Sequence, residues 1–334
     1  MLSGQAGHEQ KPSAVRSEIS SGEAEIDASA DSAHRLSRRT LFTVIAGGIG
    51  VVLLAGATGF ELVEHGVLPG KQTLDQLDGA CSVPAPELSF APIGPSVSAT
   101  FNSAARHQDV GYTIAYPPGH GPGDQLPLIV MLHGYGSNHL RAMPGMTPAH
   151  ALALKVDGSP LTPMAMVTVD GGGGYWNPHP GDDPLGMVVN ELIPLCQTRG
   201  LGTTPKGIAT MGVSMGGYGA LEIAERYPEL IGCVAAISPA VWISYGEARA
   251  ANAGAFASPS AFEAGNVVAH VDALRGIPVR VASGIDDPFH PGVEALVAVL
   301  PHGSVVVISK GCHTGDFFFS QVPPSMEFVS RHLS

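Results

Sequence analysis

The chain has 334 residues, of which 44% are apolar and only 14% are charged; this composition supplies a buried core and excludes a wholly disordered protein. The net charge is −12, and no basic cluster follows Thr40, which argues against a nucleic-acid-binding protein because phosphate recognition needs a positive surface. The four cysteines form no C-x-x-C pair, so zinc and thioredoxin-like chemistry have no support.

The N-terminal region has the pattern of an export signal. Residues 1–36 are polar, rich in Ser, Glu and Ala, and predict disorder. Residues 37–60 begin with Ser37-Arg38-Arg39-Thr40-Leu41-Phe42 and continue as an uncharged apolar stretch. Paired arginines before such a stretch resemble a twin-arginine export signal. This pattern predicts that the twin-arginine machinery delivers the protein to the cell envelope or to the medium.

Two fates of this signal remain open. Ala55-Gly56-Ala57 matches an A-x-A site for cleavage after Ala57. Alternatively, residues 41–60 are long enough to stay as a membrane anchor, although five glycines weaken that reading. Residues 61–95 are interpreted as a linker with a short helical piece, interrupted by Pro69-Gly70 and by prolines near residue 85.

From residue 96 to 334, short apolar runs alternate with longer amphipathic stretches, as in a single α/β domain. Continuous apolar strands separated by helices indicate a mostly parallel sheet, here of eight strands, with helices on both faces. Residues 240–270 break the rhythm and predict an insertion or cap over the carboxyl edge of the sheet, where α/β proteins bind ligands. The predicted strands are 97–102, 110–116, 127–133, 164–169, 206–213, 233–238, 278–283 and 304–309, with the first two antiparallel, and the predicted helices are 183–197, 216–227, 291–300 and 323–332.

A G-x-S-x-G motif, Gly212-Val213-Ser214-Met215-Gly216, lies between a predicted strand and a predicted helix. This context is typical of the nucleophile turn of the α/β-hydrolase fold, in which glycines make room for a strained turn that exposes the serine. Because a serine hydroxyl is a weak nucleophile without a base, Ser214 needs a histidine partner. The chain order expected for this fold is serine, then acid, then histidine.

His313 is the predicted general base, because it follows the last strand and precedes the closing helix. His270, His290 and His302 also follow Ser214 and are interpreted as solvated loop residues. The acid should follow the penultimate strand, where Gly284-Ile285-Asp286-Asp287-Pro288 offers two carboxylates. Asp287 is favoured as the acid that orients the histidine, with Asp286 as the alternative.

Two loops are expected to complete the site. Leu132-His133-Gly134-Tyr135-Gly136 follows the third strand, so the backbone N–H groups of Tyr135 and Met215 are the predicted oxyanion hole, with His133 bracing the loop. In the stretch 170–179, four glycines precede Tyr175 and Trp176, which are candidate substrate-binding residues. The alternative is a surface loop whose aromatic rings pack onto the domain.

The cysteines Cys81, Cys196, Cys233 and Cys312 permit three full pairings in an exported protein, and the sequence does not choose among them. Cys233 lies in an apolar run and is interpreted as a buried free thiol.

The run 132–134, the serine turn 212–220, the acid loop 284–288 and the histidine loop 311–314 together resemble the Putative esterase family of α/β-hydrolases. That family includes esterase D-like S-formylglutathione hydrolases, feruloyl esterases and the antigen 85 mycolyltransferases; segments 169–175 and 182–187 look like an exported actinobacterial subgroup. The resemblance covers residues 96–334. It implies a serine ester hydrolase that forms an acyl-enzyme on a small-molecule or lipid ester, without metal or organic cofactor.

Two features separate this chain from particular members of that family. The export signal argues against an S-formylglutathione hydrolase, whose substrate is cytosolic, and antigen 85 proteins use a glutamate where this chain has aspartates. Ester hydrolysis outside the cytoplasmic membrane is the leading hypothesis. Acyl transfer to a sugar or lipid hydroxyl would use the same catalytic residues. A non-catalytic binding protein is disfavoured by the intact Ser, Asp and His.

Overall fold

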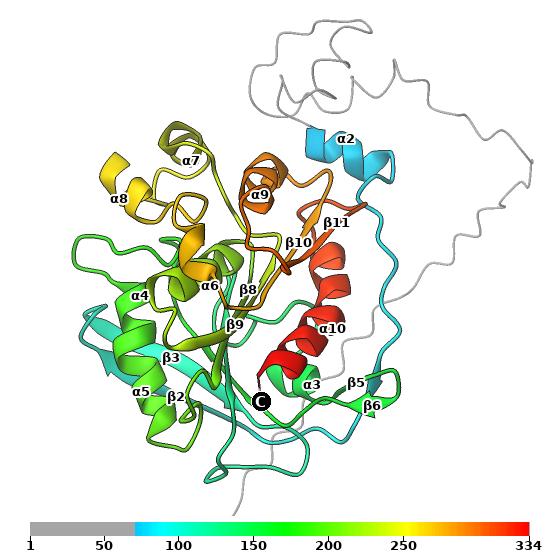
Figure 1. Ribbon diagram of the computed structural model, residues 1–334, viewed down its shortest axis with the longest axis vertical. Helices are drawn as coiled ribbons and strands as arrows, with labels where there is room; N and C mark the ends of the chain where they lie inside the picture. The colour runs from blue at the N-terminus through cyan, green and yellow to red at the C-terminus, as the bar shows by residue number, and fades with distance from the viewer. Residues whose placement is uncertain (1–70, 334) are drawn as a thin grey trace, which may run out of the picture. The chain divides into compact units, whose positions relative to one another are not determined.

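The computed structural model describes residues 71–333 (Figure 1). The predicted disordered region, the predicted export signal with its apolar stretch 41–60, and the first ten residues of the predicted linker lie outside the described residues. Within the part that is described, no helix is both long enough and apolar enough to cross a bilayer.

The domain is built on one eight-stranded sheet with the strand order β11-β10-β9-β8-β4-β7-β3-β2. Strands β2–β3 and β3–β7 pair antiparallel, and all other neighbours pair parallel. The predicted α/β-hydrolase fold with a mostly parallel eight-stranded sheet is therefore confirmed. The strands are β2 (Ser96–Ser103), β3 (Gln108–Ala115), β4 (Leu128–Leu132), β7 (Ala165–Val169), β8 (Ile208–Val213), β9 (Ile231–Ile237), β10 (Val279–Gly284) and β11 (Val305–Ser309).

Helices cover both faces of this sheet, which explains why the central strands are buried along their whole length and mostly apolar. One face packs against α6 (Met215–Arg226), the π-helical turn η2 (Val188–Leu192) and α9 (His290–Val297). The other face packs against α3 (Pro148–Leu152) and the closing helix α10 (Gly315–His332). Residues 240–270 follow the carboxyl end of β9 and hold α7 (Tyr245–Ala251) and α8 (Pro259–Ala264); η3 (Val271–Leu274) comes next.

Two predicted helices differ from the observed ones, and both contain proline inside the helical segment. The closing helix begins at Gly315 rather than near Pro323, because Thr314 caps it and Pro323 and Pro324 are accommodated inside it. The helix predicted over 183–197 is capped by Asp183 but consists of α4 (Pro184–Met187), η2 and α5 (Ile193–Gln197). The π turn comes just before Pro194, which lacks an N–H and crowds the preceding carbonyls.

Much of the segment interpreted as a linker is attached to the domain. It contains α2 (Lys71–Leu77) and β1 (Ser89–Phe90), which pairs with β5 (Leu154–Val156) in a three-stranded sheet completed by β6 (Ser159–Pro160). Between α2 and β1, Cys81 forms a disulfide with Cys312, the residue that precedes His313. Cys196 and Cys233 are buried free thiols, and burial raises the pKa of each to about 12.

Loss of this disulfide should destabilise the domain. The bond joins residues that are 231 positions apart, so it restricts the unfolded chain strongly. We expect the double variant Cys81→Ser/Cys312→Ser to lose about 2–4 kcal/mol of unfolding free energy in urea titrations. A reductant should shift the midpoint of the wild type and leave that of the double variant unchanged; an equal response of both proteins would contradict the expectation.

Two carboxyl groups are buried on helix α6, where Glu222 is 1% exposed and Glu225 is 7% exposed. Arg226 Nε donates to Glu222 Oε1 at 2.9 Å. Glu222 Oε2 and Glu225 Oε1 are buried without a hydrogen-bond partner among residues 71–333, beside a cavity of about 240 Å³. Burial raises the pKa of Glu222 to about 7 and that of Glu225 to about 9. Folding therefore keeps Glu225 protonated at neutral pH.

Stability should fall as pH rises from about 5 to about 9, because the folded state holds a proton on Glu225 that the unfolded chain loses near the ordinary pKa of 4.5. Replacement by a neutral amide removes the contribution of Glu225 and leaves that of Glu222, whose raised pKa of about 7 acts over a narrower pH range. We expect Glu225→Gln to be more stable than the wild type at about pH 8, by a few kcal/mol, in urea unfolding. The exposed Glu263→Gln is the matched control. Parallel pH profiles for Glu225→Gln and the wild type would refute the assignment.

Candidate active site

Ser214 occupies a strained turn between the end of β8 and the start of α6. Its backbone angles are φ 56° and ψ −121°, a conformation that residues with a Cβ rarely adopt. Backbone hydrogen bonds hold it there: the Ser214 N–H donates to Ile237 O at 2.9 Å, and its carbonyl accepts from Ala240 N at 3.1 Å. The neighbouring strand thus fixes the serine at the carboxyl edge of the sheet.

The two motif glycines are required by close backbone approach. A Cβ at Gly212 would lie 2.1 Å from Gly216 O, and a Cβ at Gly216 would lie 2.0 Å from Leu132 O. Both contacts are with backbone atoms, which cannot move away cheaply. The two glycines of the G-x-S-x-G pattern are therefore needed because the serine turn packs closely on itself and against the end of β4.

The structure brings together the three side chains that the sequence analysis selected. Ser214 Oγ lies 2.8 Å from His313 Nε2, and His313 Nδ1 lies 2.8 Å from Asp287 Oδ2. The Asp287 side chain is fully buried, and its other oxygen accepts from Phe289 N at 2.9 Å. This arrangement fixes the tautomer: Nδ1–H donates to the carboxylate, and Nε2 accepts from the serine hydroxyl.

The alternatives lie elsewhere. Asp287, rather than Asp286, faces the imidazole. His290 Nε2 lies 3.2 Å from Glu294 Oε1 within α9, and His270 Nε2 lies 2.9 Å from Glu263 O. His302 is in the turn before β11. Five histidines follow Ser214 in the chain, and the fifth, His332, bonds to Phe328 O within α10. Of these five, only His313 is hydrogen-bonded to the serine.

The loop after β4 runs against the serine turn. A Cβ at Gly134 would lie 3.6 Å from Ser214 Cβ, so the backbone that enters Tyr135 passes beside the hydroxyl. Met215 is the first residue of α6, where backbone N–H groups have no acceptor within the helix. Within residues 71–333, neither the Tyr135 nor the Met215 N–H donates to a protein acceptor. Both donors are therefore available to an anion formed next to Ser214.

The side chain of His133 supports this loop through two hydrogen bonds. It is fully buried, which lowers its pKa, and its Nε2 accepts from Gly171 N at 2.9 Å. Its Nδ1 therefore carries the proton and donates to Gly134 O at 2.8 Å. A neutral imidazole thus links the Tyr135 loop to the glycine-rich loop after β7.

The glycine-rich loop packs its aromatic residues into the domain. Trp176 is fully buried, donates from Nε1 to His133 O at 3.3 Å, and fills the space that side chains at Gly171 and Gly219 would need. Tyr175 is 6% exposed. The prediction that Trp176 contacts substrate is therefore wrong in this structure. The ring fills space left by the missing Cβ atoms of Gly171, on the same loop, and of Gly219, on α6, and is a core residue. Tyr175 lies just beneath the surface.

Several aromatic residues around the imidazole were not found from the sequence. The rings of Phe289 and Phe318 lie 5.0 and 4.8 Å from that of His313, between centroids. Trp242 contacts both Phe289 and Tyr175, at 5.3 and 4.8 Å. No motif marks these residues. Trp242 and Phe289 each come shortly after the carboxyl end of a strand, and this position was the one sequence feature that could have placed them near the active site.

The family assignment follows from comparison with known proteins. A family model described as "Putative esterase" matches residues 103–298. The chain belongs to this esterase family. Comparison with curated protein sequences finds no significant match.

Solved structures of esterases share the fold. A ferulic acid esterase superposes with a TM-score of 0.59 and 20% identity over 74% of this chain and 100% of that one. Fluorophosphonate-binding serine hydrolase F of Staphylococcus aureus gives 0.58 and 12% over 71% and 99%. An S-formylglutathione hydrolase from Agrobacterium tumefaciens gives 0.56 and 17% over 75% and 100%. These neighbours show that the chain shares the fold of known esterases, and the family match assigns it to a family of esterases.

Proposed function

We propose that this esterase cleaves its substrate through an acyl-enzyme on Ser214, with His313 as general base and Asp287 as the carboxylate that orients it. The observation that carries the proposal is the 2.8 Å separation of Ser214 Oγ from His313 Nε2, because a serine is nucleophilic only when a base can take its proton. The buried Asp287 carboxylate supports it by stabilising the imidazolium that forms.

In the first half of the reaction, Ser214 Oγ attacks the ester carbonyl carbon while its proton moves to His313 Nε2. The carbonyl oxygen becomes an oxyanion, which accepts hydrogen bonds from the Tyr135 and Met215 N–H groups. One such donor contributes about 3 kcal/mol to stabilisation of the transition state. His313 then gives its proton to the departing alcohol. A water molecule, deprotonated by the same imidazole, releases the carboxylic acid and restores Ser214.

The rim of the site favours esters with apolar groups. Tyr135, Ile243 and Ile285 follow the carboxyl ends of β4, β9 and β10, the same edge as Ser214, and are 61%, 54% and 50% exposed. Tyr135 also stacks near Tyr175, with 6.1 Å between ring centroids. An acyl or alcohol group that covers these side chains removes apolar surface from water, which strengthens binding. A small or lipid ester with an apolar moiety is the proposed substrate.

Product analysis tests the proposed reaction. The protein is incubated with p-nitrophenyl butyrate, with and without a sugar acceptor, and a fluorophosphonate probe is mapped to its labelled residue. We expect free butyrate under both conditions and labelling at Ser214. Acylated sugar as the main product would instead establish an acyltransferase. A protein that neither hydrolyses the ester nor reacts with the probe would be a non-catalytic member of the family.

We also propose that the protein acts outside the cytoplasmic membrane. The paired arginines Arg38 and Arg39 before an apolar stretch support this, and so does the Cys81–Cys312 disulfide, since such bonds persist in oxidising compartments. We expect Arg38→Lys/Arg39→Lys to accumulate in the cytoplasm in cell fractionation, while the neighbouring Arg35→Lys is exported normally. Unchanged export of the double variant would exclude the twin-arginine route.

A further inference from the structure

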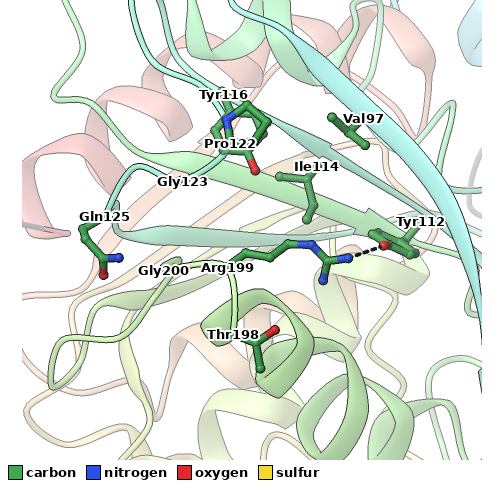
Figure 2. A pocket seen from close by; sticks show the side chains of 10 residues that line it. All are labelled: Val97, Tyr112, Ile114, Tyr116, Pro122, Gly123, Gln125, Thr198, Arg199 and Gly200. Carbon is green, nitrogen blue, oxygen red and sulfur yellow. Dashed lines mark hydrogen bonds between the residues drawn. The ribbon is translucent and has the colours of Figure 1, made fainter.

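A second cavity, of about 340 Å³, lies against β3, three positions from β8 in the strand order of the sheet. Figure 2 shows the residues that line it. Strand β3 runs antiparallel to β7, with Ala115 beside Met166, so Tyr116 lies near the amino-terminal ends of the parallel strands. Gln125 and Gly200, which also line the cavity, come before β4 and β8. The lining also includes Tyr112, which pairs with Val169 at the carboxyl end of β7, so the cavity runs along β3. Strands β7 and β4 lie between β3 and β8, the strand that Ser214 follows.

The floor of this cavity is apolar. Val97 comes from the edge strand β2, and Tyr112 and Ile114 come from β3. Its volume is in the range of cavities that hold small organic molecules. The side chains of Tyr112 and Ile114 are almost fully buried, whereas Val97 is 45% exposed at the entrance. The apolar surface open to the hydrocarbon or ring portion of a ligand is therefore supplied mainly by Val97, with Tyr112 and Ile114 forming the floor beneath it.

A positive charge is fixed at the wall of the cavity. Arg199 donates from one terminal nitrogen to Tyr112 Oη at 3.0 Å and from the other to Leu195 O at 2.9 Å. The dashed line in Figure 2 marks the bond to Tyr112. No carboxylate in the described part of the chain lies within ion-pair distance of this guanidinium. Asp124, close in sequence to the lining, is held by His120 Nδ1 and Gly121 N at 3.0 Å each.

Gln125 adds a neutral donor on another side of the lining. Its Oε1 accepts from Thr203 Oγ1 at 3.4 Å, and its amide nitrogen has no acceptor within residues 71–333. The cavity wall thus carries two N–H donor groups, one of them charged, beside the hydroxyl-bearing side chains of Tyr116 and Thr198. A guanidinium pre-positioned by two hydrogen bonds is suited to a planar carboxylate, which it binds through parallel N–H donors.

We propose that this cavity is a binding site for a small carboxylic acid with an apolar body. The carboxylate lies against the Arg199 guanidinium, and the apolar body covers Val97, Tyr112 and Ile114. A single guanidinium beside an apolar floor matches one negative charge on a hydrophobic ligand better than a multiply charged phosphate. Ester hydrolysis releases an acid of this class, so the enzyme generates candidate ligands itself. The assignment rests on the cavity alone and is independent of the role of Ser214.

Calorimetric titration with 3-phenylpropionate tests the proposal, with the uncharged 3-phenylpropanamide as the matched ligand. The wild type, Arg199→Gln and the control Arg275→Gln are compared; Arg275 is exposed and lies on another element. We expect saturable binding to the wild type and to Arg275→Gln, and at least about tenfold weaker binding of the acid to Arg199→Gln and of the amide to the wild type. Equal binding of acid and amide, or equal affinity of Arg199→Gln and wild type, would overturn it.

Binding at the catalytic centre is distinguished by two further measurements. Arg199→Gln should hydrolyse p-nitrophenyl butyrate at the wild-type rate, and the acid should still bind a protein whose esterase activity a fluorophosphonate has abolished. Val97→Trp fills the entrance of the cavity while Arg199 keeps its charge, and this variant should also abolish binding of the acid. It tests the site separately from Arg199→Gln, in case that variant misfolds. Undiminished acid binding to Val97→Trp, loss of acid binding on phosphonylation, or no saturation up to about 10 mM would each refute the site.

Discussion

Ser214→Ala is expected to lower kcat for p-nitrophenyl butyrate by roughly 10⁵- to 10⁶-fold with little change in KM. The hydroxyl is the only group of Ser214 that contacts His313, and it is absent from alanine. Because the backbone of the turn is held by hydrogen bonds to Ile237 and Ala240, the variant should fold with an unchanged thermal midpoint.

The same experiment should show that Ser214 and His313 act as a unit. His313→Ala is expected to be nearly as inactive as Ser214→Ala, and the double variant no less active than either, because each change already removes the activated nucleophile. Ser260→Ala, an exposed serine on α8, is the control and should retain full activity. Substantial residual activity in a folded Ser214→Ala protein would mean that the reaction does not use this serine.

Asp287→Asn is expected to reduce kcat by about 10⁴-fold, whereas the adjacent Asp286→Asn should retain activity within a few-fold of the wild type. The neutral amide cannot hold the imidazole in the tautomer that accepts the serine proton, nor stabilise the imidazolium. Asp287 faces His313 Nδ1 at 2.8 Å with a fully buried side chain. The size of the loss is therefore set by charge and tautomer rather than by side-chain volume.

Steady-state kinetics of both asparagine variants across pH provide the measurement, with thermal unfolding as a check on folding. Asp286→Asn is a matched control because it makes the same chemical change one residue away on the same loop. A severe defect in Asp286→Asn together with an active Asp287→Asn would transfer the orienting role to Asp286. Equal, small effects in both variants would show that His313 does not depend on a carboxylate.

The strands and the serine turn were predictable because their signals are local. Parallel strands such as β4 and β8 are buried along their whole length and consist mostly of apolar residues. Gly212 and Gly216 are required because a Cβ at either position would clash with backbone atoms of the turn or of β4. The position of His313 was predictable from chain order, since loops after adjacent parallel strands meet at one edge. The preference for Asp287 over Asp286 agrees with the observed geometry, although only the folded loop decides which carboxylate turns inward.

Features that depend on distant residues could not be predicted. The burial of Trp176 requires the absence of a Cβ at Gly171 and at Gly219, on a loop and a helix that meet only in the fold. The pairing of Cys81 with Cys312 spans 231 positions and has no local signature. The flanking rings of Phe289 and Phe318 come from different segments and converge on the imidazole. The closing helix was predicted from residue 323, whereas α10 begins at Gly315 after the cap at Thr314 and contains Pro323 and Pro324.

The disulfide beside the histidine loop affects how a shortened recombinant protein should be cut. A version that starts at the first strand of the large sheet, or at residue 103 where the family match begins, would delete Cys81 and leave an unpaired thiol at Cys312, the residue before His313. Such a protein could form mixed disulfides or dimers at that loop during purification. Its N-terminus should therefore precede Cys81, and production should take place where thiols are oxidised.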